Sequence, residues 1–161
     1  MRQFQILLAL FALLVAGFTI TGCNQGKTTR ESRVSMIQSV NPEPAAVKRN
    51  SGKDHELAEN IKKEVQAVPA IYDVAVIKGK REVLVAYKVK HMQRFHMKRI
   101  EKEIKERLEK EYPKETFIVS SDFKIFIEVL ELKKRMKDKD YSEKDSEERL
   151  QKIIQFKKEL T

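Results

Sequence analysis

A single cysteine is the residue of this chain best placed for covalent chemistry. Cys23 directly follows Ile20, Thr21 and Gly22, which supply an aliphatic residue, a small residue and a glycine. This order is typical of a bacterial lipobox, in which the thiol receives a diacylglyceryl group and a peptidase cuts before the cysteine. Small side chains are needed there because the peptidase groove accepts an extended chain. The sequence therefore predicts lipidation at Cys23.

The segment before this cysteine has the pattern of an export signal. Arg2 gives a positive start, and residues 4–20 are nearly all apolar with no acidic residue. This run is short for a membrane span of about 20 residues, and it fits the hydrophobic region of a signal peptide. An uncleaved anchor helix is the alternative. We expect residues 1–22 to be a lipoprotein signal peptide, and the mature chain to be held to a membrane by the acyl chains on Cys23.

A second candidate for chemistry is a short stretch of histidine and methionine. His91, Met92, His96 and Met97 offer imidazole and thioether ligands, a set that would suit copper. The histidines do not share one helical face at a spacing of five, and Arg94 adds a positive charge beside them. We therefore expect no metal site here, but a loop that leads into a helix with Met97 facing the core.

Side chains suited to nucleophilic catalysis are not arranged for it in the sequence. Ser120, Ser121 and Asp122 are neighbours, and adjacent residues rarely meet in catalytic geometry. The end of a strand followed by a helix N-cap explains them better. The turn at Gly79 lacks the glycine-rich length of a phosphate-binding loop. We predict no catalytic residue, no cofactor and no small-molecule substrate, with an envelope hydrolase or metalloenzyme as a third alternative.

The positive charge of the chain is concentrated outside its periodic part. The 161 residues include 33 Lys and Arg against 24 Asp and Glu, a net charge of +9. Residues 24–53 carry six basic and two acidic residues, whereas Lys and Glu are mixed in the remainder. A nucleic-acid-binding domain would concentrate its excess on one folded face, so we expect no nucleic-acid partner.

Basic residues beside an anionic leaflet contribute about 1 kcal/mol each, which makes a lipid surface a possible partner. The candidate contacts are in the tether and at a predicted hairpin: Lys48, Arg49, Lys53, Lys78 and Lys80. A solvated linker without lipid contact is the alternative.

The periodicity of the chain predicts the elements that must position these residues. Residues 23–53, rich in Ser, Thr, Asn, Gln and Pro, are expected to be the lipidated cysteine and a flexible basic tether. Residues 54–139 are expected to form an α/β domain, in the order helix, two strands around Gly79, helix and strand. Residues 140–161 are expected to form a C-terminal helix with Ser142 as its N-cap.

This order predicts an α+β fold, a small αββαβ sandwich with a three-stranded mixed sheet, both helices on one face and additional C-terminal helices. The other face is too apolar to be left wet, since it carries Ala75, Ile77, Leu84 and Ala86. The helix from Phe123 to about Lys137 either covers this face or extends the main layer. The last helix is the part expected to be mobile or to bind a second chain.

The combined pattern resembles the YhcN/YlaJ sporulation lipoprotein family of spore-forming Gram-positive bacteria, over about residues 1–140. The residues that carry the resemblance are the lipobox cysteine, the aliphatic run and the turn: Cys23, Val65, Val68, Ile71, Asp73, Val74, Ala75, Val76 and Gly79. The strand order also resembles the BON and ring-building modules of bacterial envelopes. The resemblance implies a lipoprotein of the spore or forespore envelope, connected with germination or outgrowth and without established catalysis.

Two functions are compatible with these expectations. The first is a noncatalytic module, anchored through Cys23 on the extracytoplasmic side of the forespore or spore inner membrane, that presents a sheet edge or helix face to an envelope protein. The alternative is a BON-like module that binds phospholipid headgroups directly.

Overall fold

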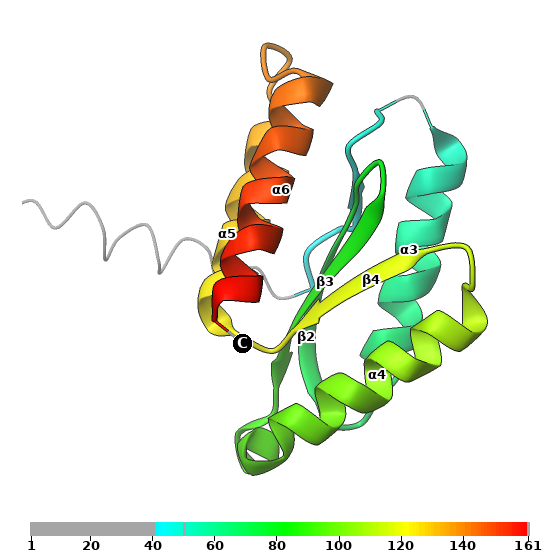
Figure 1. The fold of residues 1–161 in the computed structure, drawn as a ribbon, viewed down its shortest axis with the longest axis vertical. Coiled ribbons are helices and arrows are strands. Elements are labelled where there is room, and N and C mark those ends of the chain that lie inside the picture. The colour runs from blue at the N-terminus through cyan, green and yellow to red at the C-terminus, as the bar shows by residue number, and fades with distance from the viewer. Residues whose placement is uncertain (1–40, 50, 161) are drawn as a thin grey trace, which may run out of the picture. The chain divides into compact units, whose positions relative to one another are not determined.

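The computed structural model describes residues 41–49 and 51–160. The predicted signal peptide, Cys23 with its lipobox, and the tether up to residue 40 lie outside the described residues. Figure 1 shows the fold, whose elements follow in chain order. They are β1 (Ala45–Ala46), α3 (Gly52–Gln66), β2 (Ile71–Lys78), β3 (Glu82–Val89), the 3₁₀ helix η1 (His91–His96), α4 (Met97–Glu111), β4 (Thr116–Ser120), α5 (Phe123–Met136) and α6 (Glu143–Glu159).

The strands form one mixed sheet in the order β1-β2-β3-β4. β2 and β3 are antiparallel, whereas β1 runs parallel to β2 and β4 runs parallel to β3. The predicted α+β class, the αββαβ order and the mixed sheet are confirmed. The predicted number of strands is wrong, because β1 adds a fourth.

β1 lies inside the segment that the sequence assigned to the tether. Ala45 pairs with Ile77, and the Val47 N–H donates to the Lys78 carbonyl at 2.8 Å. The side chain of Val47 is buried. A two-residue strand has no periodicity to detect, and its partner is 32 residues away in sequence. Asn41 and the residues that follow it therefore belong to the fold, which the sequence predicts to begin only at residue 54.

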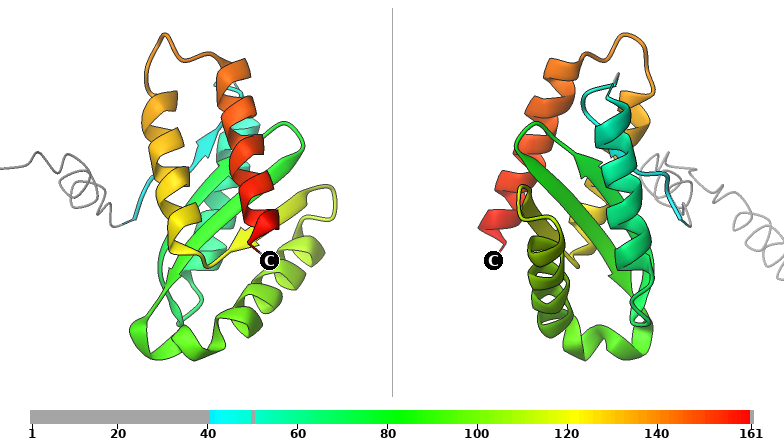
Figure 2. Two further views of the ribbon diagram at one scale, coloured as in Figure 1. Left: turned by 60° about the vertical axis from the view of Figure 1, so that its left-hand side comes forward. Right: turned by 90° about the vertical axis from the view of Figure 1, so that its right-hand side faces the viewer.

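The sheet is covered by helices on both faces, as the two views of Figure 2 show. α3 and α4 pack on the face that carries Val74, Val76 and Val85. α5 and α6 pack on the opposite face, against Ile77 and Leu84. Alternation along the strands sends neighbouring side chains to opposite faces, which is why one strand supplies both cores. Of the two alternatives that the sequence left open for this helix, the structure shows the first, in which α5 covers the second face.

The C-terminal helix is part of the core. Leu150, Ile153 and Ile154 of α6 are all buried against the second face of the sheet and α5. Ser142 caps the helix by accepting from the Asp145 N–H at 3.1 Å, as predicted. The expectation that this helix would be mobile is therefore wrong. The helix is packed, with its apolar stripe facing inward.

The sheet has two ends that differ in their loops. At the hairpin end, β2 turns into β3, and Lys78 pairs with Val83. At the η1 end, Ile71 pairs with Val89, from which the chain continues into η1. The loop between α5 and α6 lies toward the hairpin end, and η1 projects at the opposite end (Figure 1).

Candidate functional site

Apolar side chains are exposed on η1 and at the start of α4. Phe95 is 95% exposed and Met92 is 79% exposed, the largest values among the big apolar side chains of the described residues. Met97 is also exposed, at 37%, so the prediction that it faces the core is wrong. Burying such a side chain is worth about 1.5–3 kcal/mol, so a group of them in water marks a surface suited to contact.

The position of α4 explains why Met97 is exposed. The helix buries Ile100, Ile104 and Leu108, a stripe with four-residue spacing. Met97 is the first residue of the helix and lies three residues before its first buried position, Ile100. The preceding 3₁₀ turn carries Met92 and Phe95, and none of its residues is buried.

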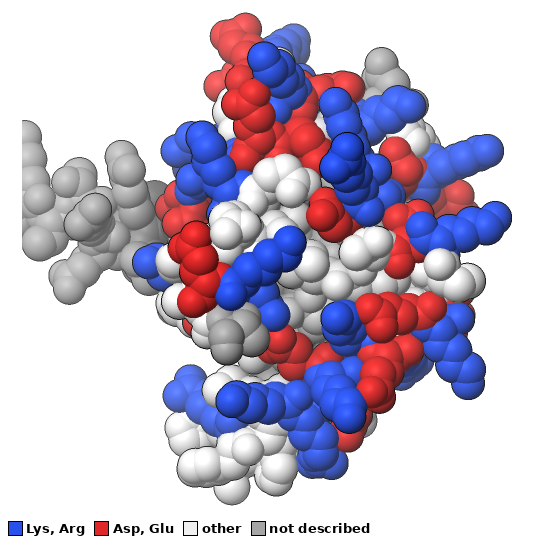
Figure 3. All heavy atoms as spheres, viewed as in Figure 1, with Lys and Arg blue, Asp and Glu red and all other residues white. Residues whose placement is uncertain are grey.

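The cations around these apolar residues lie in a run of sequence without acidic residues, and of them Arg99 pairs with Glu103 one turn further along α4, at 3.5 Å. No Asp or Glu occurs between Glu82 and Glu101. Space-filling Figure 3 shows an uncharged surface at the lower end of the molecule, where Figure 1 places η1, bordered by Lys and Arg. We call this surface the η1 patch, and its residues are Met92, Phe95 and Met97 with the exposed cations Lys90, Arg94, Lys98 and Arg99.

The histidines of this segment are not assembled into a metal centre. His91 and His96 are both exposed, at the first and last positions of η1. Within residues 41–49 and 51–160, no group of three or more His, Cys, Asp or Glu side chains could hold a metal ion.

The predicted lipid contacts are not gathered on one free surface. Lys48, Arg49, Lys53 and Lys80 are exposed, but Lys78 is only 8% exposed. Its ammonium lies 2.8 Å from Glu115 Oε2 in an ion pair. Lys78 therefore does not face the solvent.

The hairpin end also supplies partners for the Arg49 guanidinium and for the backbone N–H groups of Arg49 and Lys80. The Arg49 guanidinium donates to the carbonyls of Asp138 and Tyr141, at 2.8 Å to the former, and its backbone N–H donates to Glu143. The Lys80 N–H donates to Glu147 Oε2 at 3.0 Å. Cations and carboxylates are thus interspersed at this end.

A buried carboxylate fastens the start of the described chain to the sheet. Asp73 is fully buried, and its Oδ1 accepts from the N–H groups of Asn41 and Val74 at 2.9 and 3.0 Å. Its Oδ2 lies 3.2 Å from Lys88 Nζ. Lys88 Nζ also lies 4.7 Å from the centroid of the Phe126 ring. These contacts satisfy a charge that burial would otherwise make costly.

Two lysines lie near this carboxylate, on the helices that flank the sheet edge. Lys62 Nζ donates to the Pro42 carbonyl at 2.7 Å. Burial lowers the pKa of Lys133 to about 8, and repulsion from Lys62 and Lys137 adds to this shift. Lys62 on α3 and Lys137 at the end of α5, whose Nζ lies 3.9 Å from Glu43 Oε2, thus contact the start of the described chain from two sides and have a structural role.

The serine and aspartate at the end of β4 also have structural partners. Asp122 caps α5 by accepting from the N–H groups of Lys124 and Ile125, which confirms the predicted helix start. Ser120 is buried and accepts from the Asp122 N–H, and Ser121 lies 3.4 Å from Glu101 Oε2.

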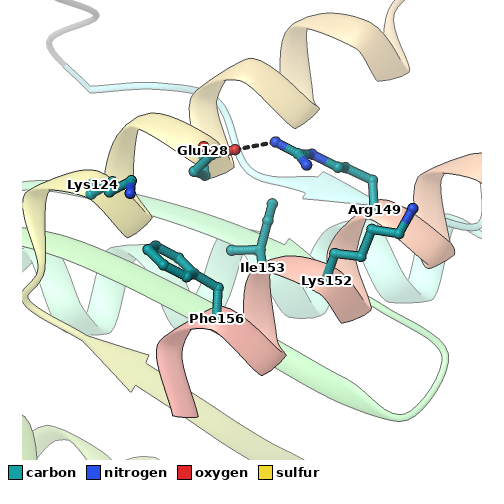
Figure 4. Close-up of a pocket in the computed structure, with 6 residues that line it drawn as sticks. All are labelled: Lys124, Glu128, Arg149, Lys152, Ile153 and Phe156. Carbon is teal, nitrogen blue, oxygen red and sulfur yellow. Dashed lines mark hydrogen bonds and ion pairs between the residues drawn. The ribbon is translucent and has the colours of Figure 1, made fainter. Parts of the chain in front are cut away.

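A hollow between α5 and α6 is shown in Figure 4. It measures about 180 Å³, and its lining residues are Lys124, Glu128, Arg149, Lys152, Ile153 and Phe156. Arg149 forms an ion pair with Glu128, and Lys124 lies 4.4 Å from the centroid of the Phe156 ring. Small-molecule sites usually measure about 300–1,000 Å³, so this hollow is not favoured as one.

Membrane spanning is not a property of the described helices. None of them, within residues 41–49 and 51–160, combines the length and the apolar composition that a crossing requires.

Comparison with known proteins identifies a family. Residues 21–154 match the family described as sporulation lipoprotein YhcN/YlaJ, and this range includes Cys23. No curated protein and no solved structure matches the chain. The match covers most of the chain and agrees with the resemblance inferred from the lipobox and the aliphatic pattern. The chain therefore belongs to the YhcN/YlaJ family of sporulation lipoproteins.

Proposed function

We propose that this chain is a noncatalytic lipoprotein of the bacterial spore envelope, in which acyl chains on Cys23 hold an α/β interaction module at a membrane. The observation that carries the proposal is where the exposed apolar surface lies. Helices close both faces of the sheet, and the two most exposed large apolar side chains of the described residues, Phe95 and Met92, both lie on the convex η1 patch. Such a surface is suited to contact with another surface rather than to the enclosure of a substrate.

The family supports the anchoring part of the proposal. The members are sporulation lipoproteins, and Cys23 is the single cysteine of the chain. The composition of residues 24–40 predicts a flexible tether, for which random-coil scaling gives a mean reach of about 20–25 Å. The module would therefore stay close to the extracytoplasmic side of its membrane, which we propose to be the forespore or spore inner membrane.

The test combines processing and location during sporulation. A fluorescent fusion of the wild-type protein is imaged through vegetative growth, sporulation and germination, beside a Cys23→Ser variant. We expect the wild type in the spore membrane fraction and the variant as an unprocessed precursor. The timing of germination and outgrowth is compared between a deletion strain and the same strain carrying either the wild type or the Cys23→Ser variant. Normal maturation of Cys23→Ser, with release from membranes by mild salt, would contradict anchoring. Unaltered germination and outgrowth in the deletion strain would contradict a role at that stage, which the family resemblance implies and which we include in the proposal.

A further inference from the structure

We propose that the η1 patch is a membrane-contact site, in which its apolar side chains enter the headgroup region of an anionic bilayer and its cations meet lipid phosphates. The inference rests on the anchoring proposed above and names the surface that meets the bilayer. It moves the lipid contact from the tether and hairpin cations, where the sequence suggested it, to the opposite end of the sheet.

The composition of the patch fits a bilayer interface. Moving Phe95 and Met92 from water into a bilayer would break few contacts within the fold, because these side chains are 95% and 79% exposed. Phenylalanine beside lysine and arginine is typical of amphipathic segments that bind membrane surfaces. Methionine is flexible and common at adaptable binding surfaces. The acid-free run between Glu82 and Glu101 leaves little local repulsion toward anionic lipids.

The place of the patch in the fold allows contact with a flat surface. η1 projects beyond the sheet and the helices at one end of the domain (Figures 1 and 2). A convex turn at an extremity can touch a plane without a clash from the remaining elements.

The start of the described chain lies toward the same end. The Asn41 N–H donates to Asp73, which is two residues along β2 from Ile71. Ile71 pairs with Val89, which leads into η1, so about 7 Å of strand separates the two positions. A chain anchored at Cys23 therefore enters the domain near the end that carries the η1 patch. One bilayer can hold the acyl chains and contact the patch together.

The size of the patch favours a lipid surface over a protein partner. A stable protein interface buries about 800 Å² on each side and requires 20–30 residues with matching shape. Three apolar side chains on η1 and the first turn of α4 provide less than this, whereas a fluid bilayer needs no complementary pocket. Acyl anchoring also raises the effective concentration of the bilayer, so a weak contact is sufficient.

The absence of tryptophan from the chain allows a direct test. The mature lipidated protein carrying Phe95→Trp is reconstituted into vesicles of phosphatidylcholine with or without phosphatidylglycerol. We expect a blue shift of tryptophan emission and loss of intensity to bromine-labelled lipids in the phosphatidylglycerol vesicles. Arg81→Trp places the same reporter at the exposed hairpin and should keep the emission of tryptophan in water.

A charge-reversal pair in the Phe95→Trp protein tests the role of the cations. Arg94→Glu with Lys98→Glu should lower the ratio of docked to undocked protein by at least about fivefold for each lost cation, and raised salt should act in the same direction. Lys48→Glu with Lys80→Glu makes the same charge change at the hairpin end and should leave the ratio unchanged.

Several results would overturn the proposal. Emission that stays water-like on both vesicles would show that the patch does not enter the bilayer. A blue shift that depends on protein concentration without vesicles would assign the patch to a second copy, and a shift that requires an added envelope protein would assign it to that protein. Flotation of the same samples reports the Cys23 anchor independently. Protein that floats while its reporter remains in water refutes the inference and leaves the anchored lipoprotein standing.

Discussion

The two ends of the sheet are both rich in cations, and they differ in the partners of those cations. At the hairpin end, Lys78 is paired with Glu115, and Arg49 is bound by the loop between α5 and α6. At the η1 end, Lys90, Arg94 and Lys98 surround exposed apolar side chains in an acid-free run. The number of basic residues in a segment therefore does not identify a binding surface. What identifies a binding surface is whether carboxylates neutralise its cations in the fold, and these carboxylates come from elements distant in sequence.

The largest difference between the two ends should be in their contribution to stability. Leu150→Ala removes a fully buried side chain from beside the hairpin and should lower the free energy of unfolding by about 2–5 kcal/mol. Phe95→Ala removes a larger side chain from η1 and should change it by less than about 0.5 kcal/mol, since Phe95 is exposed. Urea unfolding measures both. A comparable loss in Phe95→Ala would mean that η1 is packed and not a free contact surface.

The next largest loss of stability is expected from substitution of Asp73, the buried carboxylate near the η1 end. Asp73→Asn leaves Lys88 without its counter-ion and weakens the acceptor for Asn41. We expect a loss of about 2–3 kcal/mol, below the 3–5 kcal/mol of a fully buried pair because the Lys88 side chain is 23% exposed. Urea unfolding of the single variants and the double variant with Lys88→Met measures the coupling. Additive losses would contradict the ion pair.

A smaller loss is expected where the hairpin approaches α6. A Cβ at Gly79 would lie 2.5 Å from Leu150 Cδ2 and 3.1 Å from the Glu82 carbonyl oxygen. Gly79→Ala should therefore destabilise the fold by about 1–3 kcal/mol through overpacking. Gly52→Ala is the matched control, since a Cβ there meets nothing within 4 Å. Thermal unfolding compares the two, and equal midpoints would show that α6 does not close on the hairpin.

The smallest effect is the pH dependence of stability that we expect from the buried Lys133 of α5. Burial lowers the pKa of Lys133 from 10.5 to about 8, so the unfolded chain binds more protons between these values. Stability should rise with pH across this window, by an amount on the order of 1–2 kcal/mol. Lys133→Met should reduce the rise. The difference in unfolding free energy between wild type and variant, followed from pH 8 to pH 10.5, measures it. A constant difference would exclude a perturbed Lys133.

Most elements of the fold are predictable because their signals are local. The apolar stripe of α4, the alternation of β2 and β3 and the caps at Asp122 and Ser142 each depend on residues within one or two turns. β1 is not predictable in this way, since its two residues gain their hydrogen bonds from the edge of β2. The packing of α6 likewise depends on a sheet face formed far earlier in the chain.

The candidate site was only partly accessible from sequence. The acid-free run and the types of residue in the η1 patch can be recognised from the amino-acid sequence alone. Their exposure is not, because Met97 has the spacing of an inward residue with Ile100 and Ile104. The signal that could have identified the patch is the combination of Phe95 and Met92 with four cations and no carboxylate.

The sequence by itself determined the lipobox, the family, the fold class and the local starts and ends of the main helices. Tertiary structure decided which cations are neutralised, which apolar residues stay in water and how far the fold extends into the predicted tether. The physical reason is range. Helix and strand patterns depend on neighbours a few residues away, whereas burial and ion pairing depend on groups such as Glu115, 37 residues from its partner Lys78, that only folding brings together.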